Sequence, residues 1–315
     1  MAGLSNVVAV AAANDHTCAL VSGGTVACWG SNYLGALGTG SLDTAGGPGT
    51  AFPPTAVAGL SNVTSIAATD ETTCVIRSDG TVWCWGVCGE GQCGNPSAPA
   101  DDPNVTQVCA STSGATGVDA GACASFLTGA TSVSGGANSF CAILSGGTVA
   151  CWGANVGSFT PVTVAGLSGV SAVAVGEGYA CALQSTGTVA CWGSNADGQL
   201  GNGTTLASTS PTAVTGLTGA IAIAATQRDT STCALLSGGT VQCWGDNDEG
   251  QLGNGTTTNA LTPTPVSNLS QVTAISGAAC ALLTTGQIEC WGPGSDGQLG
   301  NGTTVSYSDV PVFVE

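Results

Sequence analysis

Cysteine is the residue with the most evident chemistry in this sequence, because sixteen of the 315 residues are Cys. Thiols in this number form disulfides in an oxidising compartment and are rare in cytosolic proteins. Twelve of them form six pairs, in which the second Cys follows the first by ten positions and opens the string Cys-Trp-Gly. We expect a disulfide in each pair: Cys18–Cys28, Cys74–Cys84, Cys141–Cys151, Cys181–Cys191, Cys233–Cys243 and Cys280–Cys290.

The residues between two paired cysteines have the pattern of a β-hairpin. If Cys18 lies opposite Cys28, then Val21 lies opposite Thr25, and the three residues between them form the loop. The last residue of such a loop is often left-handed, which favours Gly. All six copies have Gly there, and this register predicts cross-strand disulfides. These glycines are Gly24, Gly80, Gly147, Gly187, Gly239 and Gly286.

Four further cysteines, Cys88, Cys93, Cys109 and Cys123, lie in or beside an irregular segment at about residues 87–123. Their spacing does not match a zinc ribbon, so we expect two more disulfides. Four cysteines allow three connectivities, which the sequence leaves open. Long loops on a rigid scaffold often carry recognition, so residues 87–123 are the first candidate for a specific contact. The alternative is an insertion without a role.

Acid–base and metal chemistry have few candidates. His16 is the only histidine, and four of the other repeats have Thr, Ser or Tyr at its place, so we expect no histidine-based triad. Asp246, Asp248 and Glu249 resemble the start of a calcium loop and are the only metal candidates, although an ordinary turn is the favoured interpretation. No other cofactor is expected, and no residue is assigned a catalytic role.

The charge composition excludes two classes of partner. Arg77 and Arg228 are the only basic residues, against 19 acidic ones, and the net charge is −17. Nucleic acids and anionic lipids require a cationic surface, so binding to either is not expected. No segment approaches the ~20 apolar residues of a membrane helix. The cysteine content predicts an extracellular or cell-surface location. Met1 leads directly into the repeats, which we interpret as a mature form without its signal peptide.

The elements around the cysteine hairpins repeat along the chain. A strand of small and β-branched residues precedes each hairpin, as at residues 7–12, and a Gly-rich turn follows, as at residues 198–203. A Pro-led strand comes next, as at residues 54–57, and Pro suits a sheet edge. This pattern predicts an all-β, single-domain β-propeller with six blades of about four antiparallel strands over residues 1–315. We expect the strand at residues 311–314 to join the first blade and close the ring.

The repeat resembles that of the regulator-of-chromosome-condensation propellers. The resemblance lies in His16-Thr17-Cys18-Ala19-Leu20, in the recurrent Gly-Thr-Val-x-Cys-Trp-Gly, and in the Gly-Gln-Leu-Gly turns. It covers nearly the whole chain except about residues 95–122. It implies a propeller fold but no single task, because members include a nuclear exchange factor, a plant photoreceptor and secreted inhibitors of β-lactamases. The well-known members have seven blades, whereas this chain has six repeats.

Together these features predict a non-catalytic propeller outside the cytoplasm that binds a protein or glycan partner or serves as a scaffold. An inhibitor is a narrower form of that hypothesis. One alternative is a structural subunit of an extracellular assembly, which requires self-association. A second alternative is a polysaccharide-active enzyme, which requires a pair of carboxylates in a pocket.

Overall fold

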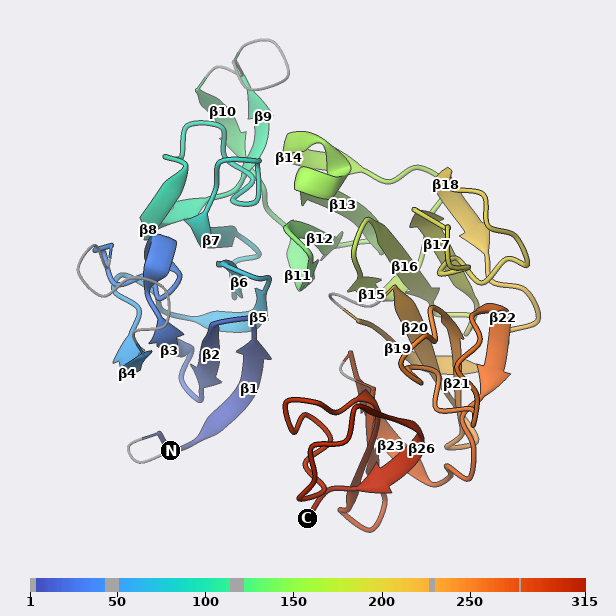
Figure 1. The fold of residues 1–315 in the computed structure, drawn as a ribbon. Coiled ribbons are helices and arrows are strands. Elements are labelled where there is room, and N and C mark those ends of the chain that lie inside the picture. The colour runs from blue at the N-terminus through green and yellow to red at the C-terminus, as the bar shows by residue number, and fades with distance from the viewer. Residues whose placement is uncertain (1–3, 43–50, 114–121, 227–229, 278) are drawn as a thin grey trace. The chain divides into compact units, whose positions relative to one another are not determined.

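The structure is a computed structural model that describes residues 4–42, 51–113, 122–226, 230–277 and 279–315. In these residues, six four-stranded antiparallel sheets follow one another along the chain, each built from four consecutive strands (Figure 1). They are the blades of the predicted six-bladed, all-β propeller. A two-stranded sheet of β9 and β10 lies between the second and third blades in the sequence. The chain divides into two compact units, residues 1–164 and 165–315, with three blades each.

The strands of the first unit are β1 (Val7–Ala12), β2 (His16–Val21), β3 (Thr25–Ser31), β4 (Ala51–Ala56), β5 (Val63–Ala68), β6 (Thr72–Arg77), β7 (Val82–Val87), β8 (Asp101–Gln107), β9 (Cys109–Thr112), β10 (Cys123–Phe126), β11 (Ala130–Gly136), β12 (Ser139–Leu144), β13 (Thr148–Gly153) and β14 (Ser158–Thr163). Those of the second unit are β15 (Val170–Val175), β16 (Tyr179–Gln184), β17 (Val189–Gly193), β18 (Ser208–Ala213), β19 (Ala220–Ala225), β20 (Ser231–Leu236), β21 (Val241–Gly245), β22 (Ala260–Pro265), β23 (Val272–Ser276), β24 (Cys280–Leu283), β25 (Ile288–Pro293) and β26 (Tyr307–Phe313). Two 3-10 helices, η1 (Tyr33–Gly35) and η2 (Ala154–Val156), occur in the first unit. None of the helices among the described residues has the length and apolar character needed to cross a membrane.

The cysteine hairpins have the predicted register. Cys18 pairs with Cys28 and Val21 with Thr25, and each of the other five hairpins places its two cysteines opposite each other. All six cross-strand disulfides are present, with Cα atoms 4.0 to 4.1 Å apart. The loop glycines have positive φ, from 74° to 84°, because the turn requires a left-handed residue there. The prediction of disulfide-stapled hairpins is confirmed.

The C-terminal strand does not belong to the blade that the sequence analysis predicted. β26 pairs with β25, with Val312 opposite Cys290, and completes the sixth blade, whereas the first blade consists of β1 to β4. The prediction that residues 311–314 join the first blade is therefore wrong. The physical reason is the short connection within a repeat: every Pro-led strand folds back on the hairpin that precedes it. The first blade already has four strands, β1 to β4, without a contribution from the C-terminal strand.

The tryptophan of the Cys-Trp-Gly motif joins neighbouring blades within each unit. Four of these indoles are fully buried, and each Nε1–H donates a 2.9 Å hydrogen bond to a carbonyl in the Gly-rich turn of the preceding blade. Two residues after that carbonyl comes a glycine at which a Cβ would lie 2.8 to 3.1 Å from the indole. The pairs of donor and acceptor are Trp85 with Ala36, Trp152 with Gln92, Trp244 with Gln199, and Trp291 with Gln251.

A buried asparagine organises the Gly-rich turn. Asn247 Oδ1 accepts the Leu252 N–H at 2.9 Å, and its Nδ2 donates to carbonyls further along the turn. Asn195 makes the same bond to the leucine five residues on. In the second blade these two places are taken by Cys88 and Cys93, which form a disulfide. A covalent bond there replaces the hydrogen bond of the other turns.

The remaining disulfide, Cys109–Cys123, belongs to the insertion. In other blades the outer strand is followed by a valine, a two-residue turn and a leucine, which lead to the next blade, as in Val214-Thr215-Gly216-Leu217. Val108 makes the backbone hydrogen bond that Val214 makes in its own blade, and Leu127 takes the place of that leucine. Residues 109–126 thus replace a two-residue turn. The insertion is narrower than the segment predicted at about residues 87–123, because residues 87–108 follow the ordinary repeat.

Candidate functional site

The proposed calcium ligands are engaged in the Gly-rich turn. Asp246 Oδ1 accepts the backbone N–H groups of Asn247 at 2.8 Å and Asp248 at 3.3 Å, and Oδ2 accepts the side-chain amide of Gln251 at 3.1 Å. The Glu249 N–H donates to Gln251 Oε1 at 2.8 Å. Within the described ranges, no group of three or more His, Cys, Asp or Glu side chains could hold a metal ion. These contacts are those of an inter-strand turn.

His16 is a buried contact between the first two blades. Its side chain is 2 % exposed, and Nε2 lies 2.8 Å from Thr73 Oγ1 of the second blade. Burial lowers the pKa of His16 from 6.5 to about 4, so the ring is neutral at pH 7. In the second unit Tyr179 occupies the same place in its repeat, and its Oη accepts the Thr232 hydroxyl at 3.0 Å. The position supplies a polar link to the next blade in both units.

Replacement of His16 is expected to weaken the pH dependence of stability. Its pKa is about 4 in the native state and about 6.5 when unfolded, so the unfolded chain binds more protons between these values. The free energy of unfolding therefore falls as the pH drops from 6.5 to 4, by about 3 kcal/mol. The variant Ala13→Gly/His16→Tyr gives the first blade the two residues that the fourth blade has at these places, Gly176 and Tyr179. Ala13→Gly is included because a Cβ at Gly176 would collide with the Tyr179 ring.

Urea denaturation at pH 7 and pH 4 measures this effect. Wild type is expected to lose about 3 kcal/mol more than the variant over that range. Equal losses in the two proteins would contradict the assignment, because the acidic residues that contribute the remaining pH dependence are common to both.

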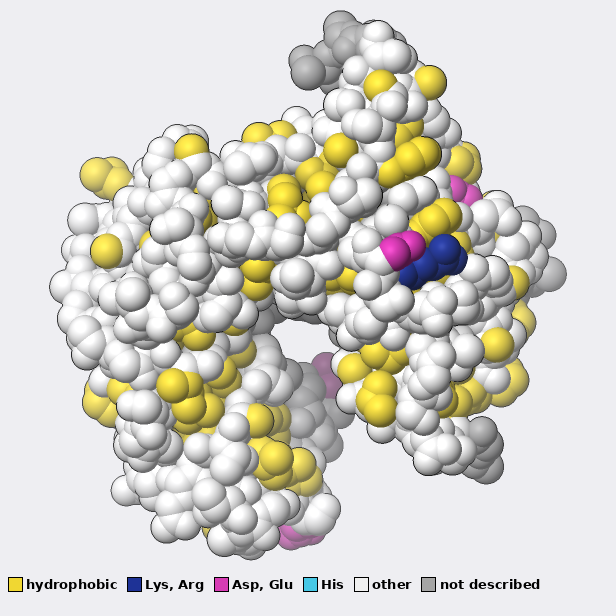
Figure 2. All heavy atoms as spheres, turned by 180° about the vertical axis from the view of Figure 1, so that it is seen from behind, with side chains coloured by type: hydrophobic (Ala, Val, Ile, Leu, Met, Phe, Trp, Pro, Cys, Tyr) yellow, Lys and Arg dark blue, Asp and Glu magenta, His cyan; other side chains and the backbone are white. Residues whose placement is uncertain are grey.

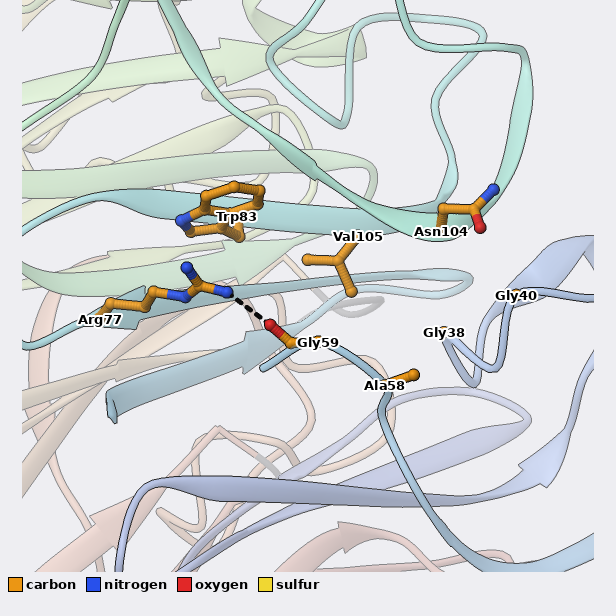
Figure 3. Close-up of a pocket in the computed structure, with 8 residues that line it drawn as sticks. All are labelled: Gly38, Gly40, Ala58, Gly59, Arg77, Trp83, Asn104 and Val105. Atoms are coloured by element: carbon orange, nitrogen blue, oxygen red, sulfur yellow. Dashed lines mark hydrogen bonds between the residues drawn. The ribbon is translucent and has the colours of Figure 1, made fainter. Parts of the chain in front are cut away.

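A pocket of about 480 Å³ lies in the first unit, between structural elements of the first and second blades (Figure 3). It combines a Gly-rich turn, the connection between the two blades, strand β8 and the β6–β7 hairpin. Its only side chains with polar groups are those of an arginine, an asparagine and a tryptophan, and none of its lining residues is acidic. The lining residues are Gly38, Gly40, Ala58, Gly59, Arg77, Trp83, Asn104 and Val105.

Arg77 is held in a defined orientation in this pocket. Its Nη2 donates a 2.7 Å hydrogen bond to the Gly59 carbonyl, and its Cζ lies 4.3 Å from the centroid of the Trp83 ring (Figure 3). The Trp83 Nε1–H in turn donates to Thr81 Oγ1 at 3.0 Å. Arg228, the other basic residue, lies outside the described residues. In Figure 2 the one basic side chain that is drawn lies beside an acidic one among hydrophobic and uncharged groups.

The acidic groups with shifted pKa values lie outside the pocket lining. Hydrogen bonds from the Thr81 side chain and backbone lower the pKa of Asp79, and the charge of Arg77 adds a smaller effect. Burial raises the pKa of Glu71, with further repulsion from three neighbouring carboxylates. The pocket therefore lacks the carboxylate pair that glycoside hydrolysis uses.

The insertion forms a short disulfide-linked hairpin of β9 and β10. Cys109 is buried at its base, and the Ser111 and Ser125 hydroxyls lie 2.6 Å apart across the two strands. Phe126 is 47 % exposed. β9 contacts β14 of the third blade, as Figure 1 also shows. Residues 114–121, between the two strands, lie outside the described residues.

Sequence reasoning did not identify the Arg77 pocket. Two signals were present: Trp83 is the only tryptophan outside Cys-Trp-Gly, and Arg77 is one of two cations. In the hairpin Val75 pairs with Trp83, and Arg77 lies two residues further along the same strand face. The alternation of strand faces therefore brings Arg77 and Trp83 together. The contact of Arg77 with Gly59, which lines the other side of the pocket, depends on packing between blades and has no signal in the sequence.

Comparisons with known structures agree on the fold. Prp20p from Saccharomyces cerevisiae is 19 % identical, with a TM-score of 0.76 over 98 % of this chain and 77 % of that chain. Human WBSCR16 is 19 % identical, with a TM-score of 0.78 over 98 % of this chain and 82 % of that chain. The ectodomain of the receptor kinase CR4 from Physcomitrella patens is 18 % identical, with a TM-score of 0.50 over 92 % and 62 %. Among curated proteins none matches the sequence.

Family models identify the repeat itself. A model of the regulator of chromosome condensation (RCC1) repeat matches residues 186–233 and 238–281. A second model of the same repeat matches residues 7–36, 63–94 and 170–199, so the matched residues make up more than half of the chain. The matches contain the cysteine hairpins at residues 18–28, 74–84 and 181–191 and the Gly-rich turns at residues 198–203 and 250–255. The chain belongs to the RCC1 repeat family.

Proposed function

We propose that this chain is a non-catalytic binding propeller that acts outside the cytoplasm and engages a protein partner through the insertion hairpin, residues 109–126. The observation that carries the proposal is the replacement of a two-residue turn by a disulfide-linked hairpin in only one of the described connections between blades. The hairpin exposes Phe126, and aromatic side chains are frequent anchors of protein interfaces. A rigid scaffold with one elaborated loop is a common arrangement for recognition.

The eight disulfides support a location outside the cytoplasm. Every described cysteine is paired, and most of the cross-strand bridges are buried within the blades. Disulfides in this number form and persist in oxidising compartments. They also restrict local unfolding, which protects an exposed protein from proteases.

A relative with the same fold supports binding of a protein. Prp20p has been characterised for its binding to Gsp1p and histones, and another structure of this yeast protein has Kap60 bound. Our chain has two basic residues against 19 acidic ones, so its net charge of −17 favours a partner that presents basic residues.

The outer strands argue for binding of a partner rather than for assembly through sheet edges. Each of the six outer strands contains proline, which lacks a backbone N–H and blocks pairing with another edge. The prolines are Pro53 and Pro54, Pro103, Pro161, Pro211, Pro263 and Pro265, and Pro311.

Replacement of residues 109–126 by Thr-Gly, the turn that joins the fourth blade to the fifth, tests the proposal. We expect the oxidised wild type to capture a protein from the medium or cell surface of the organism that makes it. Binding of that purified protein should weaken at least about tenfold in the replacement variant, as expected for loss of an interface anchor. The variant should keep its circular dichroism spectrum, because the same turn serves in another blade.

Phe126→Ser is the matched variant that keeps the hairpin and removes only the exposed ring. It should retain the fold and show part of the loss in affinity. Unchanged affinity of the Thr-Gly variant would exclude the hairpin as the interface.

A further inference from the structure

We propose that the pocket around Arg77 and Trp83, called here the Arg77 pocket, binds a carboxylate group of a peptide, either a free C-terminus or an acidic side chain. The pocket shares no residue with the insertion hairpin, although Asn104 and Val105 of β8 come shortly before it in the sequence. The inference does not depend on the function proposed for that hairpin.

Within the described part of the chain the Arg77 guanidinium forms no ion pair with a carboxylate, although its charge contributes to the lowered pKa of Asp79. Its one hydrogen bond goes to the neutral carbonyl of Gly59, and Nε, which is buried, has no hydrogen-bond partner there. The nearby carboxylate of Asp79 has its Oδ1 engaged by the Thr81 N–H at 2.9 Å and hydroxyl at 2.6 Å. A guanidinium held in a pocket without a bonded carboxylate is suited to an anion from outside.

The guanidinium is also oriented before any ligand arrives. The Trp83 ring lies against it and the Gly59 carbonyl fixes Nη2, so its plane is set by two contacts (Figure 3). A planar guanidinium fork matches the two oxygens of a carboxylate. Because the fork is already ordered, binding requires less loss of side-chain entropy.

The walls favour a peptide over a sugar or a phosphate. Gly38, Gly40 and Ala58 offer little side-chain bulk, and apart from Arg77 and Trp83 only Asn104 has a polar side chain. A sugar commonly stacks on an aromatic face, but Arg77 covers one face of Trp83. A doubly charged phosphate would meet stronger repulsion from Asp79 and from the net charge of −17 than a singly charged carboxylate.

Titration of the full-length oxidised protein with three acetylated tetrapeptides tests the inference. The first, Gly-Ala-Val-Ala, has a free C-terminal carboxylate. The second, Gly-Asp-Val-Ala, and the third, Gly-Asn-Val-Ala, are both C-terminally amidated. The readout is the NMR signal of the Trp83 indole N–H, which Trp83→Phe assigns. We expect saturable shifts with the first or second peptide at millimolar concentration and at least about tenfold weaker binding of the third.

The two acidic peptides distinguish a chain terminus from a side chain as the source of the carboxylate. Arg77→Gln should abolish the shifts. Arg228→Gln removes the same charge elsewhere in the sequence and should preserve them. Ala58→Phe, at an exposed turn position, should block the pocket without a change in charge. The Thr-Gly variant that lacks the insertion should still bind the acidic peptide, which separates the two proposals.

Equal binding of the neutral peptide would overturn the inference, as would the absence of any shift at about 20 mM peptide. An equal loss in Arg77→Gln and Arg228→Gln would show a nonspecific charge effect and would also overturn it. If Arg77→Gln fails to fold, Ala58→Phe and the comparison of peptides still decide the question.

Discussion

Reduction of all eight disulfides is expected to leave the chain unfolded at 25 °C. Six of them close hairpins over a sequence separation of ten residues, and the chain-entropy model assigns about 3 kcal/mol to a loop of that size. Even with incomplete additivity, six such contributions are comparable to the ~5–15 kcal/mol that stabilises a typical domain. The chain also has 50 glycines, which raise the conformational entropy of its unfolded state.

Circular dichroism of protein reduced in urea and returned to buffer with reductant provides the measurement. Protein unfolded in urea with its disulfides intact is the control and should recover its spectrum. In addition, Cys233→Ala/Cys243→Ala removes one bridge and should lower the free energy of unfolding by about 3 kcal/mol. A native spectrum for the reduced chain would show that packing alone maintains the blades.

The sequence predicted the local structure of each repeat well because local rules determine it. The spacing of Cys18 and Cys28, together with Gly24, specified strand register, loop length and a left-handed residue at once, and the structure has all three. The conversion of six repeats into six four-stranded blades followed from the same periodicity.

Contacts between distant residues were harder to predict. The partner of β26 depended on which repeat the last strand folds against, and the sequence pattern alone was compatible with either end. The Arg77 pocket required the carbonyl of Gly59 from another segment, which no spacing rule identifies. The connectivity Cys88–Cys93 and Cys109–Cys123, by contrast, could have been predicted by aligning the repeats. In that alignment Cys88 and Cys93 take the places of an Asn and a Leu that contact each other in other turns.

Truncation of a motif tryptophan is expected to have the largest effect of any single substitution. Trp244 is fully buried in the second unit, and its indole packs over Gly201 and donates to the Gln199 carbonyl at 2.9 Å. Trp244→Ala removes both the packing of a large aromatic ring and the hydrogen bond, so it should destabilise the protein by about 3–5 kcal/mol. The unpaired Gln199 carbonyl adds to this loss because the contact is buried.

Three variants separate packing from hydrogen bonding in urea denaturation followed by far-ultraviolet circular dichroism. Trp244→Phe keeps most of the ring and loses the donor, and should cost about 1–3 kcal/mol. Gly201→Ala keeps the donor but places a methyl group 2.8 Å from the indole at a φ of 62°, and should cost a similar amount. Trp83→Phe, outside the motif, should cost less than either, because its indole is only partly buried and donates to a hydroxyl of its own hairpin. Equal free energies of unfolding for Trp244→Phe and Trp83→Phe would show that the hydrogen bond between blades adds no stability beyond that of an ordinary surface hydrogen bond. The repeated pairing of Trp with the Gly-rich turn would then be due to packing alone.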